Sequence, residues 1–262
     1  RSHGIILVPG PTGSGKTTTL YATLKRLATE DVNVCTLEDP IEMVEPAFNQ
    51  TQVQPALDLG FAEGVSALMR QDPDIIMVGE IRDLATAEMA VQAALTGHLV
   101  LSTLHTNDAA SAITRLTDLG VPPYLTAATV VGVLAQRLAR TLCVACKQPD
   151  TSLQPEVLAA QLAPWKLKGQ PQPYKPVGCL ECRNSGYRGR VGLYELMTIG
   201  DVGRHMIHPT VDADGLRQQA AVEGMIPLRV AGAMKVAEGL TTLDEVLRMT
   251  PAWERSETMN SV

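Results

Sequence analysis

The chain has 262 residues, of which 45% are hydrophobic and 19% charged, and its formal net charge at pH 7 is −6. This length suits one large domain, or a large domain with a small appendage, and the composition is that of a globular protein. The acidic balance argues against a nucleic-acid partner, which would need a basic face. No apolar stretch reaches the roughly 18 residues of a membrane-spanning helix, and the first residues lack a signal-peptide pattern.

Short apolar runs alternate with helical patterns from residue 4 to about residue 105, which predicts a parallel sheet with crossover helices. The predicted strands cover residues 5–8, 32–37, 51–54, 75–78 and 99–103. The predicted helices cover residues 17–28, 62–70, 84–95 and 108–119, and a long apolar helix is expected over 124–138. Parallel sheets bind ligands at the carboxyl ends of their strands, and that edge is where Gly10, Glu38, Glu80 and His105 are expected to lie.

The run GPTGSGKT from Gly10 to Thr17 follows the first predicted strand and opens the first predicted helix, as a phosphate-binding P-loop does. Glycines let successive N–H groups point at phosphate oxygens, and the helix N-terminus adds partial positive charge. Lys16 can reach the β- and γ-phosphates of ATP, and the Thr17 hydroxyl can ligate Mg²⁺. The alternative is a glycine-rich turn that binds nothing. The candidate nucleotide-binding residues here are Gly10, Pro11, Thr12, Gly13, Ser14, Gly15, Lys16, Thr17 and Thr18.

Acidic residues follow two of the predicted strands. Glu38, Asp39 and Glu42 follow the second strand, and carboxylates this close together favour a cation such as Mg²⁺ and a polarised water among them. Such a run could equally be a solvated acidic turn. The strand over 75–78 resembles a Walker B segment, which delivers a carboxylate to magnesium, but the usual aspartate position is Gly79 and the acid is Glu80.

Two histidines flank the last of these strands. His105 follows it and could contact the γ-phosphate as a hydrogen-bond donor, whereas His98 precedes it. Either histidine could instead be a structural hydrogen-bonding residue. A zinc site is not expected here, because no cysteine or third histidine accompanies them.

Four of the five cysteines form two Cys-x-x-Cys pairs, Cys143 with Cys146 and Cys179 with Cys182, separated by 32 residues. This pattern predicts a structural zinc ion with four thiolate ligands. The segment between the two pairs is longer than is usual for such sites, so we interpret it as an insertion with a short helix near 155–162. Reduced thiols or a redox-active pair are the alternatives. Cys35 lies inside a predicted strand and is expected to be a small buried hydrophobe. The odd cysteine count and paired spacing favour a reducing compartment, and we expect a cytoplasmic protein.

The last part of the chain is predicted to be mainly helical. Helices are expected near 201–207, 212–223, 227–238 and 242–249. Thr242 followed by Glu245 has the spacing of a capping box, in which each side chain caps the other residue's backbone N–H.

These motifs, in this order, resemble the type II secretion and type IV pilus assembly ATPases of the secretion ATPase superfamily. The likeness runs over essentially the whole chain and rests on the P-loop, the Glu38–Glu42 acidic box, the 70–83 Walker B segment, the 96–107 histidine box, the four cysteines, the 186–195 run and the 224–229 segment. The cysteines favour the assembly branch over pilus retraction motors. The resemblance implies an α/β fold: a RecA-like P-loop NTPase core with a mostly parallel sheet over residues 1–140, a tetracysteine zinc segment over 141–195 and a helical region over 196–262.

The resemblance also implies roles for individual residues. Lys16 and Thr17 would hold phosphate and Mg²⁺, and Glu80 would position the Mg²⁺. Glu42 would be the general base for the attacking water, with Glu38 supporting it. The resemblance also implies that His105 lies near the γ-phosphate and that Arg70 or Arg82 lies at a shared subunit interface. The family often has a second arginine four residues before Arg70, where this chain has Ser66.

The implied protein is an ATP-hydrolysing hexameric ring at the inner membrane of a Gram-negative-type bacterium, working with a membrane platform protein and a cytoplasmic adaptor. The family has a further domain before the P-loop strand, so we expect this chain to behave as a C-terminal ATPase domain that binds nucleotide but hydrolyses it poorly. One alternative is a RecA-like nucleic-acid motor, although 3% aromatic residues leave little for bases to stack on. The other alternative is an adaptor in which bound nucleotide acts only as a switch.

Overall fold

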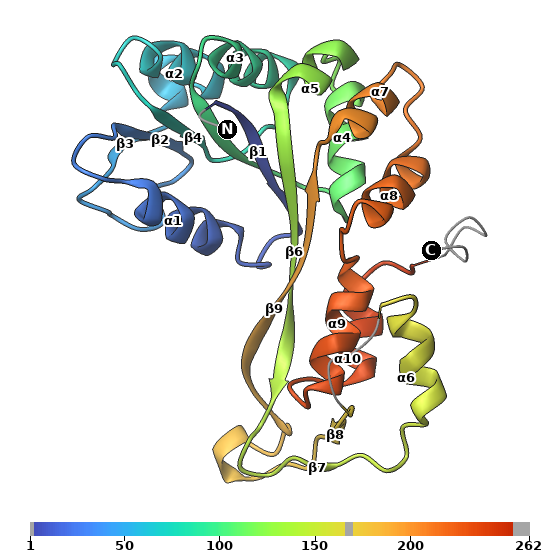
Figure 1. Ribbon diagram of the computed structural model, residues 1–262. Helices are drawn as coiled ribbons and strands as arrows, with labels where there is room; N and C mark the ends of the chain where they lie inside the picture. Colours follow the sequence, from blue (N-terminus) through green and yellow to red (C-terminus); the bar gives the residue numbers. More distant parts are fainter. Residues whose placement is uncertain (1–2, 166–169, 254–262) are drawn as a thin grey trace. The chain divides into compact units, whose positions relative to one another are not determined.

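The computed structural model describes residues 3–165 and 170–253 and divides the chain into two compact units (Figure 1). Unit 1 comprises residues 1–135 and 196–220, and unit 2 comprises residues 136–195 and 221–262. The boundary falls inside the two long strands β6 (Val130–Leu142) and β9 (Tyr187–Thr198), so both strands contribute to both units.

The main sheet has the strand order β3-β2-β4-β5-β1-β6-β9. Its first five strands in the chain are β1 (Gly4–Pro9), β2 (Val34–Glu38), β3 (Asn49–Gln52), β4 (Ile75–Val78) and β5 (Leu99–Leu104). The pairs β3–β2, β2–β4, β4–β5, β5–β1 and β1–β6 are all parallel. The predicted parallel sheet is therefore confirmed, with strand bounds that differ from the predicted ones by at most two residues.

Helices cover both faces of the sheet in unit 1 (Figure 1). The helices of this unit are α1 (Lys16–Leu27), α2 (Phe61–Leu68), α3 (Leu84–Leu95), α4 (Ala109–Asp118), α5 (Pro123–Thr129), α7 (Asp201–Met206) and most of α8 (Ala213–Val222), with a 3-10 turn at Pro55–Leu57. On the α1 face, Leu20 and Leu24 pack with alternate strand residues such as Val8 and Met77 in one buried cluster. Alternation places neighbouring residues such as Leu37 on the opposite face, where α2, α3 and α4 pack.

The predicted helix over 124–138 is wrong beyond residue 129. α5 ends at Thr129, and the chain continues directly as β6. The Val130-Val131-Gly132-Val133 run explains the change, because β-branched residues favour strands and glycine weakens a helix. Pairing with β1 then fixes this run as a parallel strand, with Ile6 opposite Gly132 and Leu7 opposite Val133.

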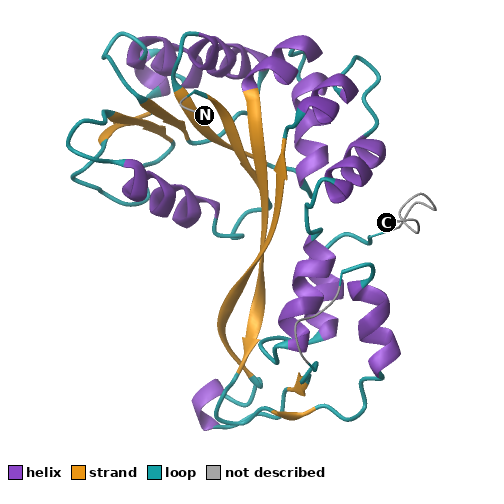
Figure 2. Ribbon diagram, in the orientation of Figure 1, coloured by secondary structure: helices purple, strands orange, loops and turns teal. Residues whose placement is uncertain are grey.

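Unit 2 is built mainly from short elements (Figure 2). These are α6 (Pro155–Leu162), α9 (Leu228–Ala237), α10 (Leu243–Met249), the two-residue strands β7 (Gln148–Pro149) and β8 (Tyr174–Lys175), which pair antiparallel, and a 3-10 turn at Leu180–Cys182. The helices share a small buried cluster that includes Leu158, Leu162, Val236 and Val246. The short helix predicted near 155–162 is thus confirmed, and it packs against α9 rather than standing apart as an insertion.

The expected three segments do not coincide with the two units. The first boundary, expected after residue 140, falls after Ala135. The expected helical region over 196–262 is divided, because α7 and most of α8 belong to unit 1 while α9 and α10 belong to unit 2. One contact that ties α8 to unit 1 is an ion pair between Arg217 and the buried Asp108, at 3.0 Å. Residues 254–262 of that region lie outside the described residues.

In the part of the chain that the structure describes, no helix combines the length and the apolar character of a membrane span.

Candidate functional site

The P-loop connects the end of β1 to the first turn of α1. Gly13 and Gly15 adopt φ angles of 77° and 87°, a left-handed conformation that favours glycine. The Gly10 N–H donates to the Leu104 carbonyl at 3.1 Å, which fixes the start of the loop to β5. The Lys16 ammonium donates to the carbonyls of Gly10 and Pro11 at 2.9 and 3.1 Å, so the lysine lies across the loop that it would serve.

The carboxyl ends of β1, β2, β4 and β5 meet at one edge of the sheet, because these strands are neighbours and parallel. Gly10, Glu38, Glu80 and His105 lie at or just after those ends. The convergence expected from the sequence is therefore present. It is the arrangement in which open α/β sheets bind their ligands.

Glu38 is buried at the end of β2, with 4% of its surface exposed. Three side chains hydrogen bond to its carboxylate: the Tyr21 hydroxyl at 2.7 Å, the Thr36 hydroxyl at 2.6 Å and the Gln50 amide at 3.2 Å. Burial, reinforced by the Glu38 carboxylate, raises the pKa of Tyr21, so the hydroxyl keeps its proton and remains a donor.

Asp39 and Glu42 do not share the buried environment of Glu38. Both are exposed in the loop after β2. The sequence interpretation placed three close carboxylates around a cation. In the structure, hydrogen-bond donors surround the first carboxylate and water can reach the other two, so the three need no common cation. Glu42 is left accessible to solvent in this loop.

Gly79 and Glu80 show why the acid stands one position later than in the usual Walker B pattern. The Gly79 N–H donates to the Leu37 carbonyl at 2.8 Å, and its own carbonyl accepts from the Thr103 hydroxyl at 2.7 Å. A Cβ atom at Gly79 would lie 3.2 Å from the Leu37 carbonyl oxygen, closer than ordinary van der Waals contact. β2 and Phe61 of α2 therefore leave little room for a side chain at this position, and the buried Glu80 presents the carboxylate instead.

Two other predicted site residues, Arg82 and His105, contact Glu80. Arg82 forms an ion pair with one carboxylate oxygen of Glu80, and His105 Nε2 lies 3.4 Å from the other. The Glu80 carboxylate raises the pKa of Arg82. Arg82 and His105 are both exposed, whereas Glu80 is buried. The result is a carboxylate held between two cationic or hydrogen-bonding groups at the sheet edge.

Arg70 does not contact this group in the structure. It follows α2, is exposed, and its guanidinium donates to the Ser66 hydroxyl at 3.4 Å. Ser66 is the position at which the sequence departs from the family, so this serine contacts the remaining arginine instead of providing a second one.

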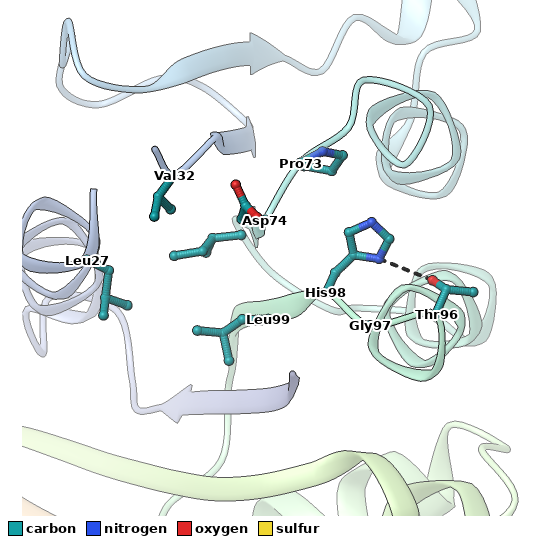
Figure 3. Close-up of a pocket in the computed structure, with 9 residues that line it drawn as sticks. Leu27, Val32, Pro73, Asp74, Thr96, Gly97, His98 and Leu99 are labelled. Atoms are coloured by element: carbon teal, nitrogen blue, oxygen red, sulfur yellow. Dashed lines mark hydrogen bonds between the residues drawn. The ribbon is translucent and has the colours of Figure 1, made fainter. Parts of the chain in front are cut away.

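His98 lies at the opposite, amino-terminal ends of the strands, in a cavity of about 530 Å³ (Figure 3). Its Nδ1 is 2.9 Å from the Ala93 carbonyl oxygen and 3.1 Å from the Thr96 hydroxyl, which requires the proton on Nδ1. His98 is thus a structural hydrogen-bonding residue, which was one of the two alternatives that the sequence allowed. His105 lies at the other edge of the sheet.

The four paired cysteines form the one cluster of potential metal ligands found among the described residues, with all four sulfur atoms within 4.8 Å of one another. Tetrahedral zinc with Zn–S bonds of about 2.3 Å requires sulfur atoms about 3.8 Å apart. The Cys143–Cys179, Cys146–Cys182 and Cys179–Cys182 sulfur distances are 3.9, 3.9 and 3.7 Å. These four thiols therefore fit zinc and lie far beyond the length of a disulfide bond.

Two backbone N–H groups favour the thiolate form of Cys182, whereas burial raises the pKa of the neighbouring Cys146 thiol to about 11. The N–H groups of Cys179 and Gly186 both point at the Cys182 sulfur, at 3.2 Å. Burial opposes ionisation of Cys182, but these N–H groups and the neighbouring thiols lower its pKa to about 6. Thiolate is the form that binds zinc. Cys35 is separate from this group and is buried within β2, as predicted.

Sequence reasoning missed Tyr21 and Gln50, which contact Glu38 from α1 and from β3. A clue to Tyr21 was available in the sequence, because it is an aromatic residue with a hydroxyl, one turn beyond the P-loop and next to the apolar Leu20 and Leu24. The pattern for Gln50 carried no signal, because its partner Tyr21 is 29 residues away along the chain.

Comparison with known proteins places this site in a family. Residues 1–248 match the family model described as "Type II/IV secretion system protein". The chain is 61% identical over 251 residues to the type IV pilus assembly ATPase TfpB of Acinetobacter baylyi, covering 95% of this chain and 43% of that protein. It is 51% identical over 250 residues to the type II secretion system protein E of Pseudomonas aeruginosa, covering 95% of this chain and 49% of that protein.

Among solved structures, the pilus retraction motor PilT with bound ADP is similar, with a TM-score of 0.67 and 29% identity, over 98% of this chain and 64% of that one. The chain thus spans slightly less than half the length of the two sequence relatives named here. The family model covers nearly all of it, and the chain belongs to the type II/IV secretion system protein family.

Proposed function

We propose that the protein containing this chain is an ATPase that powers assembly of a type IV pilus or of the pseudopilus of type II secretion. The observation that carries this proposal is the meeting of the P-loop, Glu38, Glu80 and His105 at one sheet edge, in a chain of this family. The higher identity to a pilus assembly ATPase, 61% against 51%, is our reason for putting the pilus first.

The site supports a division of labour in ATP hydrolysis. The P-loop N–H groups and Lys16 would bind the phosphates, while Thr17 and Glu80 would hold Mg²⁺, which supplies charge neutralisation for phosphoryl transfer. Glu42, exposed at the same edge, would accept the proton of the attacking water, with Glu38 buried behind it. His105 would donate to the γ-phosphate region.

Arginines would complete the site from a neighbouring subunit. Arg82 and Arg70 are both exposed, as residues that serve a subunit interface must be before assembly. We therefore propose a hexameric ring in which one or both arginines act on a neighbour's nucleotide. Arg82 would have to leave Glu80 for this role, because the two form an ion pair in the structure.

The four paired cysteines would hold a structural zinc ion, with all four positions filled and none left for a substrate. We place the protein in the cytoplasm, at the inner membrane of a Gram-negative-type bacterium. Its partners there would be other copies of itself, a membrane platform protein and a cytoplasmic adaptor. Family membership favours this machinery over a nucleic-acid motor.

Replacing Glu42 with Gln tests the enzyme proposal in the complete gene product. Loss of a general base typically costs about 10²- to 10⁴-fold in rate, so ATP turnover should fall by that factor while ATP binding, measured by calorimetry, persists. The matched control is Glu88→Gln, which removes an exposed carboxylate on α3 of the same unit and should leave turnover unchanged. Normal turnover in Glu42→Gln would remove the assigned base. Lost turnover with normal piliation or secretion in cells would favour the nucleotide-switched adaptor.

A further inference from the structure

The loop between β2 and β3 carries Glu42 and is held by side chains on both sides of that residue. Before it, the Ile41 N–H donates to the Gln52 side-chain oxygen at 3.3 Å. After it, the Met43 carbonyl oxygen accepts from the Gln50 amide at 2.9 Å and lies 2.9 Å from the Tyr21 hydroxyl oxygen. Glu42 itself is exposed, so its position depends on how its two neighbours are held.

Tyr21 and Gln50 also bond to each other and to Glu38. The Gln50 amide lies 2.8 Å from the Tyr21 hydroxyl oxygen, and its side-chain oxygen accepts from the Glu45 N–H at 2.8 Å. One consistent assignment has Tyr21 donating its single proton to Glu38. The two amide protons of Gln50 then serve Met43 and the Tyr21 oxygen.

The ring of Tyr21 is fixed independently of its hydroxyl. It is 2% exposed, and it packs edge-to-face on Phe48, with ring centroids 5.6 Å apart. Removal of the hydroxyl alone should therefore leave the ring in place. The hydroxyl oxygen accepts from Gln50, whose amide also donates to the Met43 carbonyl, and this chain connects the loop to α1, the helix whose first residues are Lys16 and Thr17.

From this geometry we propose that Tyr21 and Gln50 are positioning residues: they hold the Glu42 loop against the P-loop helix, so that the base and the phosphate-binding residues keep one fixed separation. This inference rests on the proposed function of Glu42. Neither residue needs to touch the nucleotide. Both would act on the rate of the chemical step rather than on nucleotide affinity.

Tyr21→Phe in the complete gene product tests this inference. A small misplacement of a catalytic group can cost as much as 10²-fold, so we expect kcat to fall roughly 10- to 100-fold. The dissociation constant for ADP, measured by calorimetry, should not change. The matched control is Tyr187→Phe, which removes a hydroxyl that lies 3.0 Å from the Thr242 hydroxyl in unit 2 and should leave turnover intact.

Two further variants separate positioning from a general loss of structure. Gln50→Leu removes the amide but keeps Tyr21, so it should reproduce the kcat loss even if Tyr21→Phe folds poorly. In the Glu42→Gln background, Tyr21→Phe should lower the residual turnover no further, because the base that it positions is already absent.

The outcomes distinguish this inference from the proposed function. If Glu42→Gln abolishes turnover while Tyr21→Phe and Gln50→Leu leave kcat unchanged, the positioning role is wrong and the ATPase proposal stands. A loss of ADP affinity parallel to the loss of kcat would make Tyr21 part of nucleotide binding and would also overturn the inference. Full turnover in Glu42→Gln would overturn both.

Discussion

The candidate nucleotide site of unit 1 lies at the end of buried parallel strands, whereas the cysteine cluster of unit 2 lies among residues with little apolar surface around them. In unit 1, β4 is buried along its whole length and β2 likewise, so the sheet that positions Glu38 and Glu80 is held by its own core. Beside the cysteines, Val144 and Leu180 are 82% and 92% exposed. Apolar packing holds the first site, whereas apolar residues next to Cys143 and Cys179 in the second site face solvent, although Cys143 and Cys182 themselves are buried.

This difference indicates that the nucleotide site depends on the fold of unit 1, whereas the fold of unit 2 depends on its cysteine site. The nucleotide site should be a consequence of the fold, present before any ligand binds. The cysteine cluster should be a cause of the fold around it, because a bound zinc ion would replace the missing core. Loss of the zinc ion should therefore destabilise unit 2 without affecting unit 1, and a defect in the apolar core of unit 1 should leave unit 2 unaffected.

The largest expected effect is the loss of zinc from unit 2. Structural zinc can contribute on the order of 10 kcal/mol to folding, so Cys179→Ser or a strong chelator should unfold the region around the cluster. Both tryptophans of the chain, Trp165 and Trp253, belong to unit 2 and pack together with ring centroids 6.0 Å apart. Tryptophan fluorescence during urea unfolding therefore reports on unit 2, while calorimetric ADP binding reports on unit 1 and should persist.

Cys35→Ala is the matched control for that experiment, since it removes a cysteine buried in β2 and leaves the four paired cysteines intact. Its tryptophan transition should match that of the wild type, and elemental analysis should still find about one zinc per chain. A wild-type protein without zinc, together with an unchanged transition in Cys179→Ser, would refute the proposed dependence of unit 2 on metal.

A smaller effect is expected from adding one methyl group to each unit. A Cβ atom at Gly64 in α2 would lie 2.4 Å from Leu37, and one at Gly232 in α9 would lie 2.4 Å from Val246. Overpacking typically costs about 1–3 kcal/mol, against a gain of up to about 1 kcal/mol for alanine over glycine in a helix. Leucine can rotate about two side-chain bonds and valine about one, so Gly232→Ala should cost more, about 2 kcal/mol.

The pair Gly64→Ala and Gly232→Ala also tests whether the units unfold independently. Gly232→Ala should lower the urea midpoint of the tryptophan signal and leave ADP binding unchanged, and Gly64→Ala should leave the tryptophan midpoint unchanged. If both substitutions shift the tryptophan transition equally, the two units unfold together and the contrast between them does not extend to stability.

The sequence could predict those parts of the structure that depend on residues close together in the chain, and could not predict those that depend on residues far apart. The P-loop and β4 are local patterns, so their bounds and place in the site could be read directly, as could the helix α3 at 84–95. β6 could not, because its strand pairing is long-range: residues 130–133 pair with β1, over 120 residues earlier in the chain, and β6 also neighbours β9 in the sheet. The β-branched residues and glycine at 130–133 are a local signal for a strand, but the apolar character of the run is equally compatible with a helix.

The same distinction holds within the candidate site. The positions of Lys16, Glu80 and the four cysteines could be predicted because local motifs identify them, while their binding roles stay predictions. The Tyr21–Gln50 contact was not readable, since it joins α1 to β3 and exists only after the sheet has formed. The reason for glycine at position 79 was equally hidden, because it lies in the approach of β2 rather than in the β4 sequence.

The smallest expected effect concerns Glu245, which the sequence assigned to a capping box. The Thr242 hydroxyl does accept from the Glu245 N–H, at 3.4 Å. The buried Glu245 carboxylate, however, accepts from the Arg140 guanidinium at 2.7 Å and pairs with Arg248 as well. The ion pair with Arg140 thus replaces the reciprocal cap and connects β6 to α10 within unit 2.

Burial opposes ionisation of Glu245, but the hydrogen bonds from Arg140 lower its pKa below the ordinary value for glutamate. A lowered folded-state pKa stabilises the fold above the unfolded-state pKa, and this stabilisation is lost as the pH falls through the folded-state pKa. Glu245→Gln should therefore destabilise unit 2 by about 1–2 kcal/mol at pH 7, where both arginines keep partial contact with water. The difference from wild type should begin to shrink once the pH falls below the unfolded-state pKa of glutamate, about 4.3, and should therefore already be smaller at pH 4 than at pH 7.

Urea unfolding followed by tryptophan fluorescence, at pH 7 and at pH 4, measures both quantities, and comparison at equal pH cancels any effect of acid on the cysteine cluster. Glu238→Gln is the control, because its ion pair with Lys235 is exposed at the glutamate and should contribute less than about 1 kcal/mol at either pH. If the Glu245→Gln difference stays constant between the two pH values, the carboxylate contributes by packing rather than by charge. The electrostatic link between β6 and α10 would then be wrong, and unit 2 would depend on its cysteine cluster more completely than the structure suggests.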